Sequence, residues 1–375
     1  MNSEFPTYSF KLEFYDERAD LVRPYVLMYF THLGEIEIID LRQKRIFLKK
    51  TTNHNVQIKD LYIGNKLLIN GRQYEIIDYQ NEETKNAFDK QSQHTYAMLK
   101  PGNINRLGEA LERITDSGLV VAKLRYGYIT KETASKFYQE HVGKPFYDDL
   151  IRYITSGPIV AMDLVGPNAI KKWRTIIGPT NLDTAKKEAP NSLRALYARS
   201  TTENFAHGSD SPESSARELQ IIFGENAVEL ASQCEGSTLC IIKPHAINEG
   251  LAGPIIRQIV GEGFTIAGAV MTTLEIPTAG EFLEVYKTVV GDYSDMVSEL
   301  ASGLLIALEL VKDNAVSELR KLCGPRDVSV AKQIRPQSLR AIFGTDLVHN
   351  AVHCTDLEED APLEVEYFFV ILETE

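Results

Sequence analysis

Apolar and polar residues alternate in six short runs within the first 90 residues of the chain. Alternation with a period of two is typical of strands that bury one face. Asn70-Gly71 is a pair preferred in two-residue hairpin turns, and His32-Leu33-Gly34 marks another turn. The pattern therefore predicts a small antiparallel all-β domain, as a curved sheet or barrel. The runs cover residues 8–14, 25–30, 35–40, 45–48, 66–69 and 74–79.

From residue 95 the pattern changes to strands that are separated by runs with helical spacing. Leu107, Ala110, Leu111 and Ile114 follow the i, i+3, i+4, i+7 spacing of one helix face, and Gly118 is expected to end that helix. Strands are expected at 95–99, 119–128 and 159–164, and helices at 106–117, 131–141, 147–155 and 168–177. The order predicts an α+β sandwich of the split-βαβ, or ferredoxin-like, kind.

A long irregular stretch is expected after residue 177, and a short strand at His207 follows it. Ser211 and Pro212 then open a helix, since serine is a preferred N-cap and proline a preferred first helical residue. The free N–H groups at such a helix start favour a nearby anion. A neutral imidazole there could attack a phosphoryl group. The alternative is that His207-Gly208 is an ordinary surface turn.

A second copy of this segment indicates that a whole domain is duplicated. Four polar residues recur 146 positions later, and Lys100-Pro101 recurs as Lys243-Pro244. A period of this length is too long for a solenoid. We expect an N-terminal domain at 1–90, repeat one at 94–226 and repeat two at 237–375, with a polar linker over 80–93. The recurring pairs are Arg174 with Arg320, Arg194 with Arg340, Asn204 with Asn350, and His207 with His353.

Composition narrows the class of protein. The chain has 375 residues, of which 43% are hydrophobic and 25% charged, as in ordinary globular proteins. A net charge of −12 argues against a general binder of nucleic acids or of anionic membranes. No apolar run reaches the roughly 20 residues of a membrane helix, and the first residues lack a signal-peptide core. Cys234, Cys240, Cys323 and Cys354 show no metal-binding spacing, which is typical of reduced thiols in the cytosol.

Repeat one contains seven short motifs: Leu99-Lys100-Pro101, Phe137-Tyr138, Lys144-Pro145-Phe146, Ser156-Gly157-Pro158, Gly178-Pro179-Thr180-Asn181, Leu193-Arg194 and the segment from Asn204 to Ser211. Together these motifs resemble the nucleoside diphosphate kinases. An all-β domain ahead of two such repeats is similar to ciliary members of that family, whose leading domain is of the DM-ten type. The motif from Asn204 to Ser211 is the most specific of them.

The resemblance implies a ping-pong transfer of the γ-phosphate of a nucleoside triphosphate, through a phosphohistidine, to a nucleoside diphosphate. It also implies Mg²⁺ on the phosphates and no dedicated protein ligands for the metal. Cations and positioning suit phosphoryl transfer, because its transition state spreads charge over the phosphate oxygens. The resemblance implies that His207 is the nucleophile and that Glu218, with Ser209, orients its ring. It implies that the phosphates are bound by Lys100, Arg174, Thr180 and Arg194. It further implies that Asn204 binds the sugar, that Tyr138 lies near the transferred group and that Phe146 stacks on the base.

Each of these residues also has a simpler interpretation. Lys100 could be a solvated lysine, and Glu218 an exposed acid on a helix. Arg174 and Arg194 could form surface ion pairs, which stabilise little, while Tyr138 and Phe146 could be core aromatics.

Gly102 stands where the family usually has aspartate. Three extra residues between Thr180 and Arg194 lie in the loop that governs subunit contacts in the family, so a tandem pseudo-dimer is expected in place of the usual hexamer.

Repeat two departs further from the family pattern. Arg326 replaces the phosphate-binding threonine, Cys354-Thr355 replaces Gly-Ser, and no phenylalanine stands at the base-stacking position. Repeat two is therefore expected to be weakly active or inactive, and nucleotide binding without turnover or a structural role both stay open. It keeps Lys243, Tyr286, Arg320, Arg340, Asn350 and His353, with Glu364 at the helix position.

The expected partners follow from the same resemblance. They are nucleoside di- and triphosphates and, for a ciliary member, tubulin of the doublet microtubule or other axonemal proteins, with no nucleic acid and no membrane. The expected location is the cytoplasm and cytoskeleton, at the ciliary axoneme. The alternative function is a structural protein inside ciliary doublets, with the kinase repeats as scaffolds. Because tubulin tails and this chain are both acidic, docking is expected to depend on shape and apolar contact.

Overall fold

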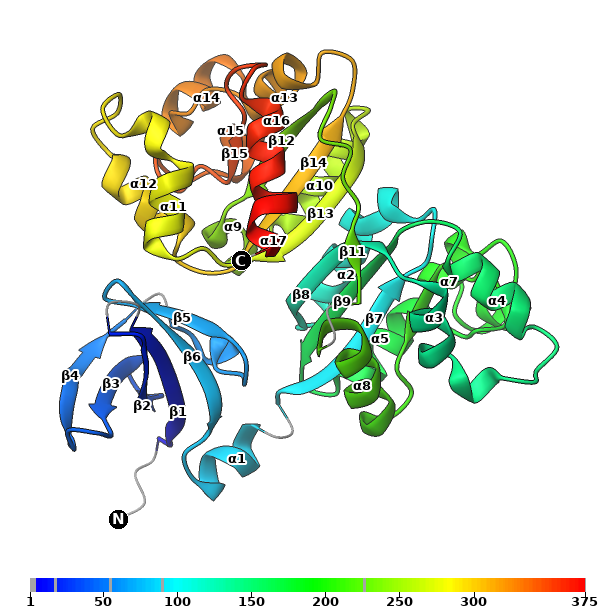
Figure 1. Cartoon of the computed structure of the whole chain (residues 1–375), viewed down its shortest axis with the longest axis horizontal. Helices are drawn as coiled ribbons and strands as arrows, with labels where there is room; N and C mark the ends of the chain where they lie inside the picture. The colour runs from blue at the N-terminus through cyan, green and yellow to red at the C-terminus, as the bar shows by residue number, and fades with distance from the viewer. Residues whose placement is uncertain (1–4, 17–18, 54–55, 89–90, 225–226, 375) are drawn as a thin grey trace.

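The computed structural model describes residues 5–16, 19–53, 56–88, 91–224 and 227–374. The chain forms one sheet in the N-terminal domain and a second sheet that both repeats share (Figure 1). This confirms an α+β fold with two tandem repeats behind a strand-rich domain. The expected bounds at residues 90, 226 and 375 lie outside the described residues. Within the described ranges, no helix is long and apolar enough to cross a membrane.

The N-terminal domain is a six-stranded antiparallel sheet with the strand order β4-β3-β2-β1-β6-β5. Each of the six alternating runs falls on one strand, and the alternation places side chains such as Phe10, Leu12, Tyr25 and Ile38 in a shared core. The sheet leaves β4 and β5 at its two edges. The strands are β1 Thr7–Asp16, β2 Leu21–Phe30, β3 Glu35–Asp40, β4 Arg45–Thr52, β5 Lys66–Ile69 and β6 Arg72–Tyr79.

The stretch expected to be a linker contains helix α1, Glu82–Phe88. Phe88 is 2% exposed and packs into the core of the N-terminal domain. The side chain of Thr84 accepts a hydrogen bond from the backbone N–H of Ser9 at 2.9 Å. The helix therefore belongs to the N-terminal domain, and its polar composition reflects the face that points to solvent.

The two repeats contribute four strands each to a shared antiparallel sheet with the order β10-β7-β9-β8-β13-β14-β12-β15, and β11 pairs with β8. Within each repeat the strands lie in the order fourth, first, third, second, as the ferredoxin-like fold requires. The strands are β7 Gln93–Leu99, β8 Val120–Tyr128, β9 Ile159–Gly166, β10 Ala206–Gly208, β11 Glu229–Leu230, β12 Ser237–Ile242, β13 Thr265–Thr272, β14 Leu305–Val311 and β15 Val352–Cys354.

Most helices match the expected positions, but the stretch after residue 177 contains two helices that the sequence pattern did not predict, α6 and α7. The helices of repeat one are α2 Leu107–Asp116, α3 Lys131–Phe137, α4 Tyr147–Ile154, α5 Ala169–Ile177, α6 Leu182–Glu188, α7 Leu193–Tyr197 and α8 Pro212–Leu219. Those of repeat two are α9 Pro244–Asn248, α10 Ala252–Gly261, α11 Ile276–Phe282, α12 Tyr293–Leu300, α13 Ala315–Cys323, α14 Val328–Ile334, α15 Leu339–Phe343, α16 Ala361–Glu366 and α17 Leu372–Thr374.

The repeats join through their second strands and their first long helices. Tyr126 and Arg125 on β8 pair with Ala269 and Val270 on β13, and α2 packs against α10. A Cβ atom added at Gly108 would lie 2.8 Å from the backbone nitrogen of Arg257. The helices approach this closely because glycine occupies the crossing point. Two repeats of one chain thus form the expected pseudo-dimer.

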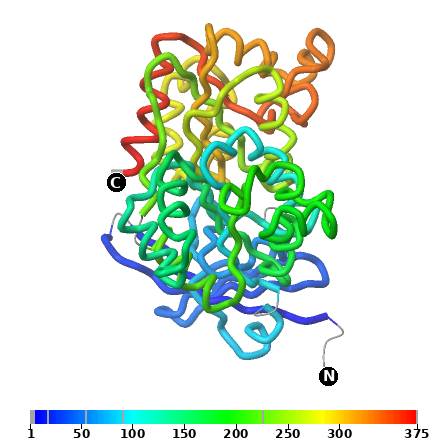
Figure 2. Tube along the Cα trace, turned by 90° about the vertical axis from the view of Figure 1, so that its right-hand side faces the viewer, coloured from blue at the N-terminus to red at the C-terminus, as the bar shows by residue number. Residues whose placement is uncertain are grey.

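The N-terminal domain contacts repeat two through β5 and β6. The side-chain amide of Gln73 donates a hydrogen bond to the carbonyl of Leu274 at 2.7 Å, and Leu68 packs against the core of repeat two. In Figure 2 this domain, in blue, lies at the end of the molecule opposite the orange helices of repeat two.

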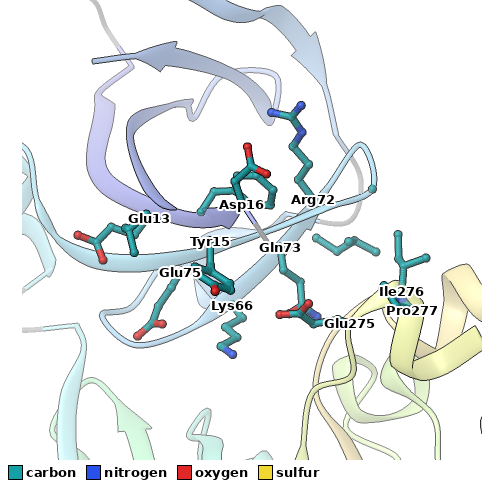
Figure 3. Close-up of a pocket in the computed structure, with 14 residues that line it drawn as sticks. Glu13, Tyr15, Asp16, Lys66, Arg72, Gln73, Glu75, Glu275, Ile276 and Pro277 are labelled. Atoms are coloured by element: carbon teal, nitrogen blue, oxygen red, sulfur yellow. The ribbon is translucent and has the colours of Figure 1, made fainter. Parts of the chain in front are cut away.

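A cleft of about 600 Å³ opens beside the contact, between β1, β6 and the start of α11 (Figure 3). It contains carboxylates such as Glu13 and Glu275 together with Lys66.

Candidate active site

The segment around His207 is held by main-chain hydrogen bonds to the first strand of repeat one. His207 pairs with Met98 across β10 and β7, and the backbone N–H of Lys100 donates to the carbonyl of Phe205 at 2.9 Å. Phe205 has a φ of +77°, which is unfavourable for a side chain of this size. Such strain persists where the surrounding structure fixes the backbone, and it is common at functional sites. Ala351 repeats it in repeat two, with a φ of +68°.

The ring of His207 is oriented by a carboxylate. Nε2 of His207 lies 3.0 Å from Oε2 of Glu218, and the hydroxyl of Ser209 donates to the same oxygen at 2.7 Å. Glu218 is 4% exposed, so the sequence-based alternative of an exposed acid is wrong. The carboxylate accepts, so Nε2 carries the hydrogen and the lone pair of Nδ1 is left for chemistry. The ring remains partly accessible, with 22% of the side chain exposed.

Two buried cations bind backbone carbonyls of the segment just before this histidine. Lys100 is 6% exposed and donates from Nζ to the carbonyl of Thr202 at 3.0 Å, so it is not a solvated lysine. Burial, together with the charge of Arg194, lowers the pKa of Lys100 to about 7. Arg194 donates to the carbonyls of Gly178 and Ala206, each at 2.7 Å. Burial and the nearby Arg174 lower the pKa of Arg194 to about 10.

The structure also brings together the other residues implied as phosphate ligands. Nη1 of Arg194 lies 3.3 Å from the hydroxyl of Thr180. Arg174, Thr180, Arg194 and Asp210 line one cavity of about 610 Å³. A hydrogen bond from Ser214, outweighing partial burial, lowers the pKa of Asp210. The cavity therefore combines two guanidinium groups with one ionised carboxylate.

Several buried polar atoms around His207 lack hydrogen-bond partners among the described residues. They include the side-chain oxygen of Asn204, the hydroxyl of Tyr138 and Nε of Arg194. Buried polar groups are normally paired, so unpaired ones near a site require a partner such as a ligand or water. Tyr138 is also a core residue, 5% exposed, with its ring edge-on to His207 at 6.0 Å. Phe146, in contrast, is 43% exposed at the start of α4, so it is not a core aromatic.

Trp173 is a site residue that sequence reasoning missed. Its Nε1 donates to the carbonyl of His207 at 2.9 Å. A Cβ atom added at Gly208 would lie 2.5 Å from Cδ1 of Trp173. The space beside Gly208 is therefore filled by this indole. The signal was available, because Trp173 is the only tryptophan of the chain and lies on the buried face of a predicted helix.

Repeat two places its recurring residues in the same positions but ties several of them to carboxylates. The hydroxyl of Tyr286 donates to Asp356 at 2.6 Å, and Nε of Arg320 lies 3.6 Å from the same carboxylate. Arg326, which replaces threonine, pairs with Asp292. Asp356 corresponds to Asp210, which makes no such contact with Tyr138. Tyr286, Arg320 and Arg326 of repeat two are therefore already paired with carboxylates, whereas the side-chain oxygen of Asn350 is unpaired among the described residues, like that of Asn204.

The second histidine is also less accessible. Nε2 of His353 lies 3.2 Å from Oε2 of Glu364, and 9% of the His353 side chain is exposed. Arg340 donates to the carbonyl of Gly324 at 2.9 Å, and its Nη2 lies 3.7 Å from Sγ of Cys354. The cavity that these residues line has a volume of about 70 Å³.

Lys243 is 8% exposed, and burial with the charge of Arg340 lowers its pKa to about 7. Asn350 donates its side-chain amide to the carbonyls of Arg326 and Leu347, each at 3.1 Å.

A protein ligand set for a metal is not found in the described ranges: no group of three or more histidine, cysteine, aspartate or glutamate side chains there could hold an ion. Asp210 is the carboxylate that lines the cavity with Arg174 and Arg194. Its oxygens are of the type that Mg²⁺ prefers, and Mg²⁺ commonly binds through one carboxylate, water and substrate phosphates. The donor set therefore fits a phosphate-bound Mg²⁺ beside Asp210.

Comparison with known proteins gives a consistent result for both repeats. The sequence model described as "Nucleoside diphosphate kinase" matches residues 93–228 and 236–373. The chain is 42% identical to rat "Nucleoside diphosphate kinase homolog 7", over 98% of this chain and 93% of that protein. It is 45% identical to the nucleoside diphosphate kinase of Deinococcus radiodurans over 36% of this chain and 96% of that protein. A crystal structure of the Aquifex aeolicus nucleoside diphosphate kinase aligns with a TM-score of 0.35 and 38% identity, covering 36% of this chain and 99% of that one.

Proposed function

We propose, from the premise that this chain belongs to the nucleoside diphosphate kinase family, that repeat one transfers the γ-phosphate of a nucleoside triphosphate to a nucleoside diphosphate through His207. The family is one of phosphotransferases that act on nucleotides. The observation that carries the proposal is the pair of hydrogen bonds from Ser209 and His207 to Glu218. They leave Nδ1 of the imidazole available, and the buried cations Lys100 and Arg194 bind carbonyls of the segment just before it.

The proposed reaction has two steps. Nδ1 of His207 attacks the γ-phosphorus, a new N–P bond forms, and the bond between phosphorus and the bridging oxygen breaks. The nucleoside diphosphate leaves with the electron pair on that oxygen. In the second step the terminal phosphate oxygen of another nucleoside diphosphate takes the phosphoryl group from Nδ1. Lys100, Arg174 and Arg194 would offset the charge on the phosphate oxygens in both steps.

The remaining residues would position the nucleotide. Phe146 offers an exposed ring to the base, and a ring face does not distinguish one base from another. The unpaired side-chain oxygen of Asn204 would accept from a sugar hydroxyl, and the free hydroxyl of Tyr138 would meet the transferred group. Mg²⁺, when bound to the phosphates beside Asp210, would neutralise part of their charge.

The experiment is a phosphoryl-trapping assay. Incubation of the full chain with γ-labelled ATP should give a phosphoprotein that is labile in acid and stable in base, and added nucleoside diphosphate should discharge it. The His207→Ala variant should lose the label, while Glu358→Ala, at a solvent-exposed position of repeat two, should keep it. Full labelling of His207→Ala would refute the assignment.

We propose further that repeat two contributes little to turnover. The contacts of Asp356 with Tyr286 and Arg320, and of Asp292 with Arg326, support this, because a nucleotide would have to replace them. His353→Ala should therefore leave the transfer rate within about twofold of the unsubstituted chain, which is the size expected of a change outside the reacting groups. A loss of most activity in this variant would show that repeat two carries the reaction.

A second proposal concerns the N-terminal domain. We infer that it docks the chain onto an axonemal partner, such as tubulin of the doublet microtubule, and that the chain works in the cytoplasm at the cilium. This domain has its own folded core and a free β4 edge, and the match to the rat relative covers 98% of this chain and therefore includes it. These observations support a dedicated role for the domain. Deletion of residues 1–88 should abolish ciliary incorporation of a tagged chain, and unchanged incorporation would refute the docking role.

A further inference from the structure

The most basic surface of the N-terminal domain lies on its outer edge. Residues 42–50 contain five cations and no acid, although the whole chain has a net charge of −12. We call this segment the basic edge; its cations are Arg42, Lys44, Arg45, Lys49 and Lys50. It covers the turn between β3 and β4 and most of β4. Figure 1 shows β4 at the side of the domain that faces away from repeat one.

The cations of the basic edge are exposed and mostly free. Among the described residues, Arg42, Lys44 and Lys49 make no ion pair, while Lys50 pairs with Glu35 at 2.9 Å. Arg45 lies opposite Asp40 in the strand pairing. The paired strand β3 carries Glu35, Glu37 and Asp40, so five cations here outnumber three neighbouring acids. The acids farther along the chain do not cancel the remaining positive potential, since salt screens them beyond roughly 10 Å.

Apolar side chains are exposed between these cations. Ile46 is 53% exposed and Phe47 is 41% exposed. The ring of Phe47 packs against that of Tyr25, with ring centroids 5.3 Å apart. The guanidinium of Arg72 lies 4.7 Å from the centroid of the Phe47 ring. The ring is therefore held in place rather than free to fold over the surface. A fixed apolar centre with a charged rim is the usual anatomy of a protein interface.

Protection of the sheet edge does not account for this composition. Lysines and bulges on edge strands prevent sheets from pairing with one another, and β4 has both, with register shifts opposite Ile36 and Ile38. That purpose explains Lys49 and Lys50. It does not explain Arg42 and Lys44, which lie on the turn, and exposed isoleucine and phenylalanine would work against it.

We propose that the basic edge binds an acidic polypeptide segment that carries apolar side chains. The cations would meet carboxylates, and Ile46 with Phe47 would take the apolar groups. A nucleic acid or an anionic membrane is a poorer match, because each extends well beyond these nine residues and would meet the acidic remainder of the chain. The inference deepens the docking role proposed above, and it replaces the expectation that docking depends on shape and apolar contact alone.

The test is a binding titration with defined probes on the full chain. A fluorescein-labelled, glutamate-rich peptide that carries two phenylalanines should bind, and affinity should fall as salt rises from about 0.05 M to about 0.5 M. Arg42→Glu with Lys44→Glu and Lys49→Glu should weaken binding by about tenfold or more, as loss of complementary rim charge predicts. Phe47→Ser should weaken binding at high salt, where apolar contact dominates.

The matched control reverses three lysines elsewhere that are also exposed: Lys85→Glu, Lys131→Glu and Lys332→Glu. The two triple variants have the same net charge, so equal loss of binding in both would overturn the proposal. So would tighter binding of single-stranded DNA or of phosphatidylserine vesicles than of the peptide, or no peptide binding at all. Because this titration needs no cilium and no kinase activity, its failure is distinguishable from failure of ciliary docking or of phosphoryl transfer.

Discussion

Glu218 lies 3.0 Å from Nε2 of His207 and thereby decides which nitrogen of the imidazole is free. The two residues are eleven positions apart, on β10 and α8, and Ser211 caps the start of α8 between them. The oxygen that faces the histidine also accepts the hydroxyl of Ser209. One carboxylate oxygen therefore holds both the tautomer and the rotamer of the proposed nucleophile.

The first prediction tests this contact. Glu218→Gln should lower kcat by about 10- to 100-fold, as loss of a group that orients a functional histidine typically does. KM should change much less, because Glu218 contacts the ring and not the nucleotide. Steady-state kinetics would measure the two parameters separately.

The corresponding loss in Ser209→Ala should be smaller, about fivefold, because it removes a hydrogen bond worth roughly 1 kcal/mol. Glu213→Gln provides the control, since Glu213 lies on the same helix and is exposed. An increase in KM with normal kcat for Glu218→Gln would place this residue on the nucleotide instead of on the ring.

The second prediction concerns Lys243, whose pKa burial lowers to about 7 from an ordinary value of 10.5. Below pH 7 the lysine is charged in both the folded and the unfolded chain, so folding bears the cost of burying the charge. Between pH 7 and 10.5 only the unfolded chain stays protonated, so this cost declines as pH rises. Lys243→Met should therefore raise the free energy of unfolding at pH 6, by about 2 kcal/mol, and the gain should shrink toward pH 10.

Urea unfolding at pH 6, 8 and 10 would follow the gain. The exposed Lys332→Met serves as the control, with little expected effect at any of these values, because surface substitutions usually change stability by less than about 0.5 kcal/mol. A Lys243→Met variant that is less stable at pH 6 would mean that the hydrogen bond from Lys243 to the carbonyl of Val348 outweighs the burial of its charge.

Local sequence signals predicted much of the fold. Alternation located the six strands of the N-terminal domain, and Ser211 with Pro212 located the start of α8, where the serine accepts from the N–H of Ser214 at 3.1 Å. Helices α6 and α7 were missed although each has an N-cap, Asn181 and Ser192. Both are short, and short helices depend on packing more than on periodicity.

The parts of the site that could not be predicted depend on non-local contacts. Nothing near Gly208 in the sequence indicates that Trp173 fills the space beside it. In repeat two, Cys354 stands at the position of Gly208 and Leu319 at that of Trp173. Gly208 with Trp173 and Cys354 with Leu319 fill about the same total side-chain volume, because a larger residue at one position is matched by a smaller one at the other. Cys354 alone is therefore weak evidence that repeat two has lost its function.

The third prediction tests the carboxylates of repeat two. Asp292→Asn with Asp356→Asn removes the charges that hold Arg326, Arg320 and Tyr286. Uncompensated cations should then attract a nucleotide, and binding should rise from about one to about two ADP per chain. Isothermal titration calorimetry would give the stoichiometry. Asp116→Asn with Asp313→Asn, both exposed, should leave it at one; an unchanged stoichiometry in the first variant would show that charge pairing does not close this site.

The fourth prediction concerns the crossing of α2 and α10. In Gly108→Ala the new Cβ would lie 2.7 Å from Cγ of Arg257 and 2.8 Å from both the Arg257 nitrogen and the Gly253 carbonyl oxygen. Two of these three atoms belong to the backbone, so the helices would have to move apart. Overpacking of this kind costs about 1–3 kcal/mol, and it should lower the free energy of unfolding and loosen the β8–β13 pairing.

Gly261→Ala separates this effect from helix propensity. Gly261 is the last residue of α10, and a Cβ there would meet nothing within 4 Å. Because alanine favours a helix over glycine by up to about 1 kcal/mol, this variant should be as stable as the unsubstituted chain or slightly more stable. Urea unfolding would compare the two variants, and amide hydrogen exchange at Tyr126 and Val270 would report the strand pairing between repeats. Equal stability of both variants would mean that the repeats can separate without cost, and that each folds without support from the other.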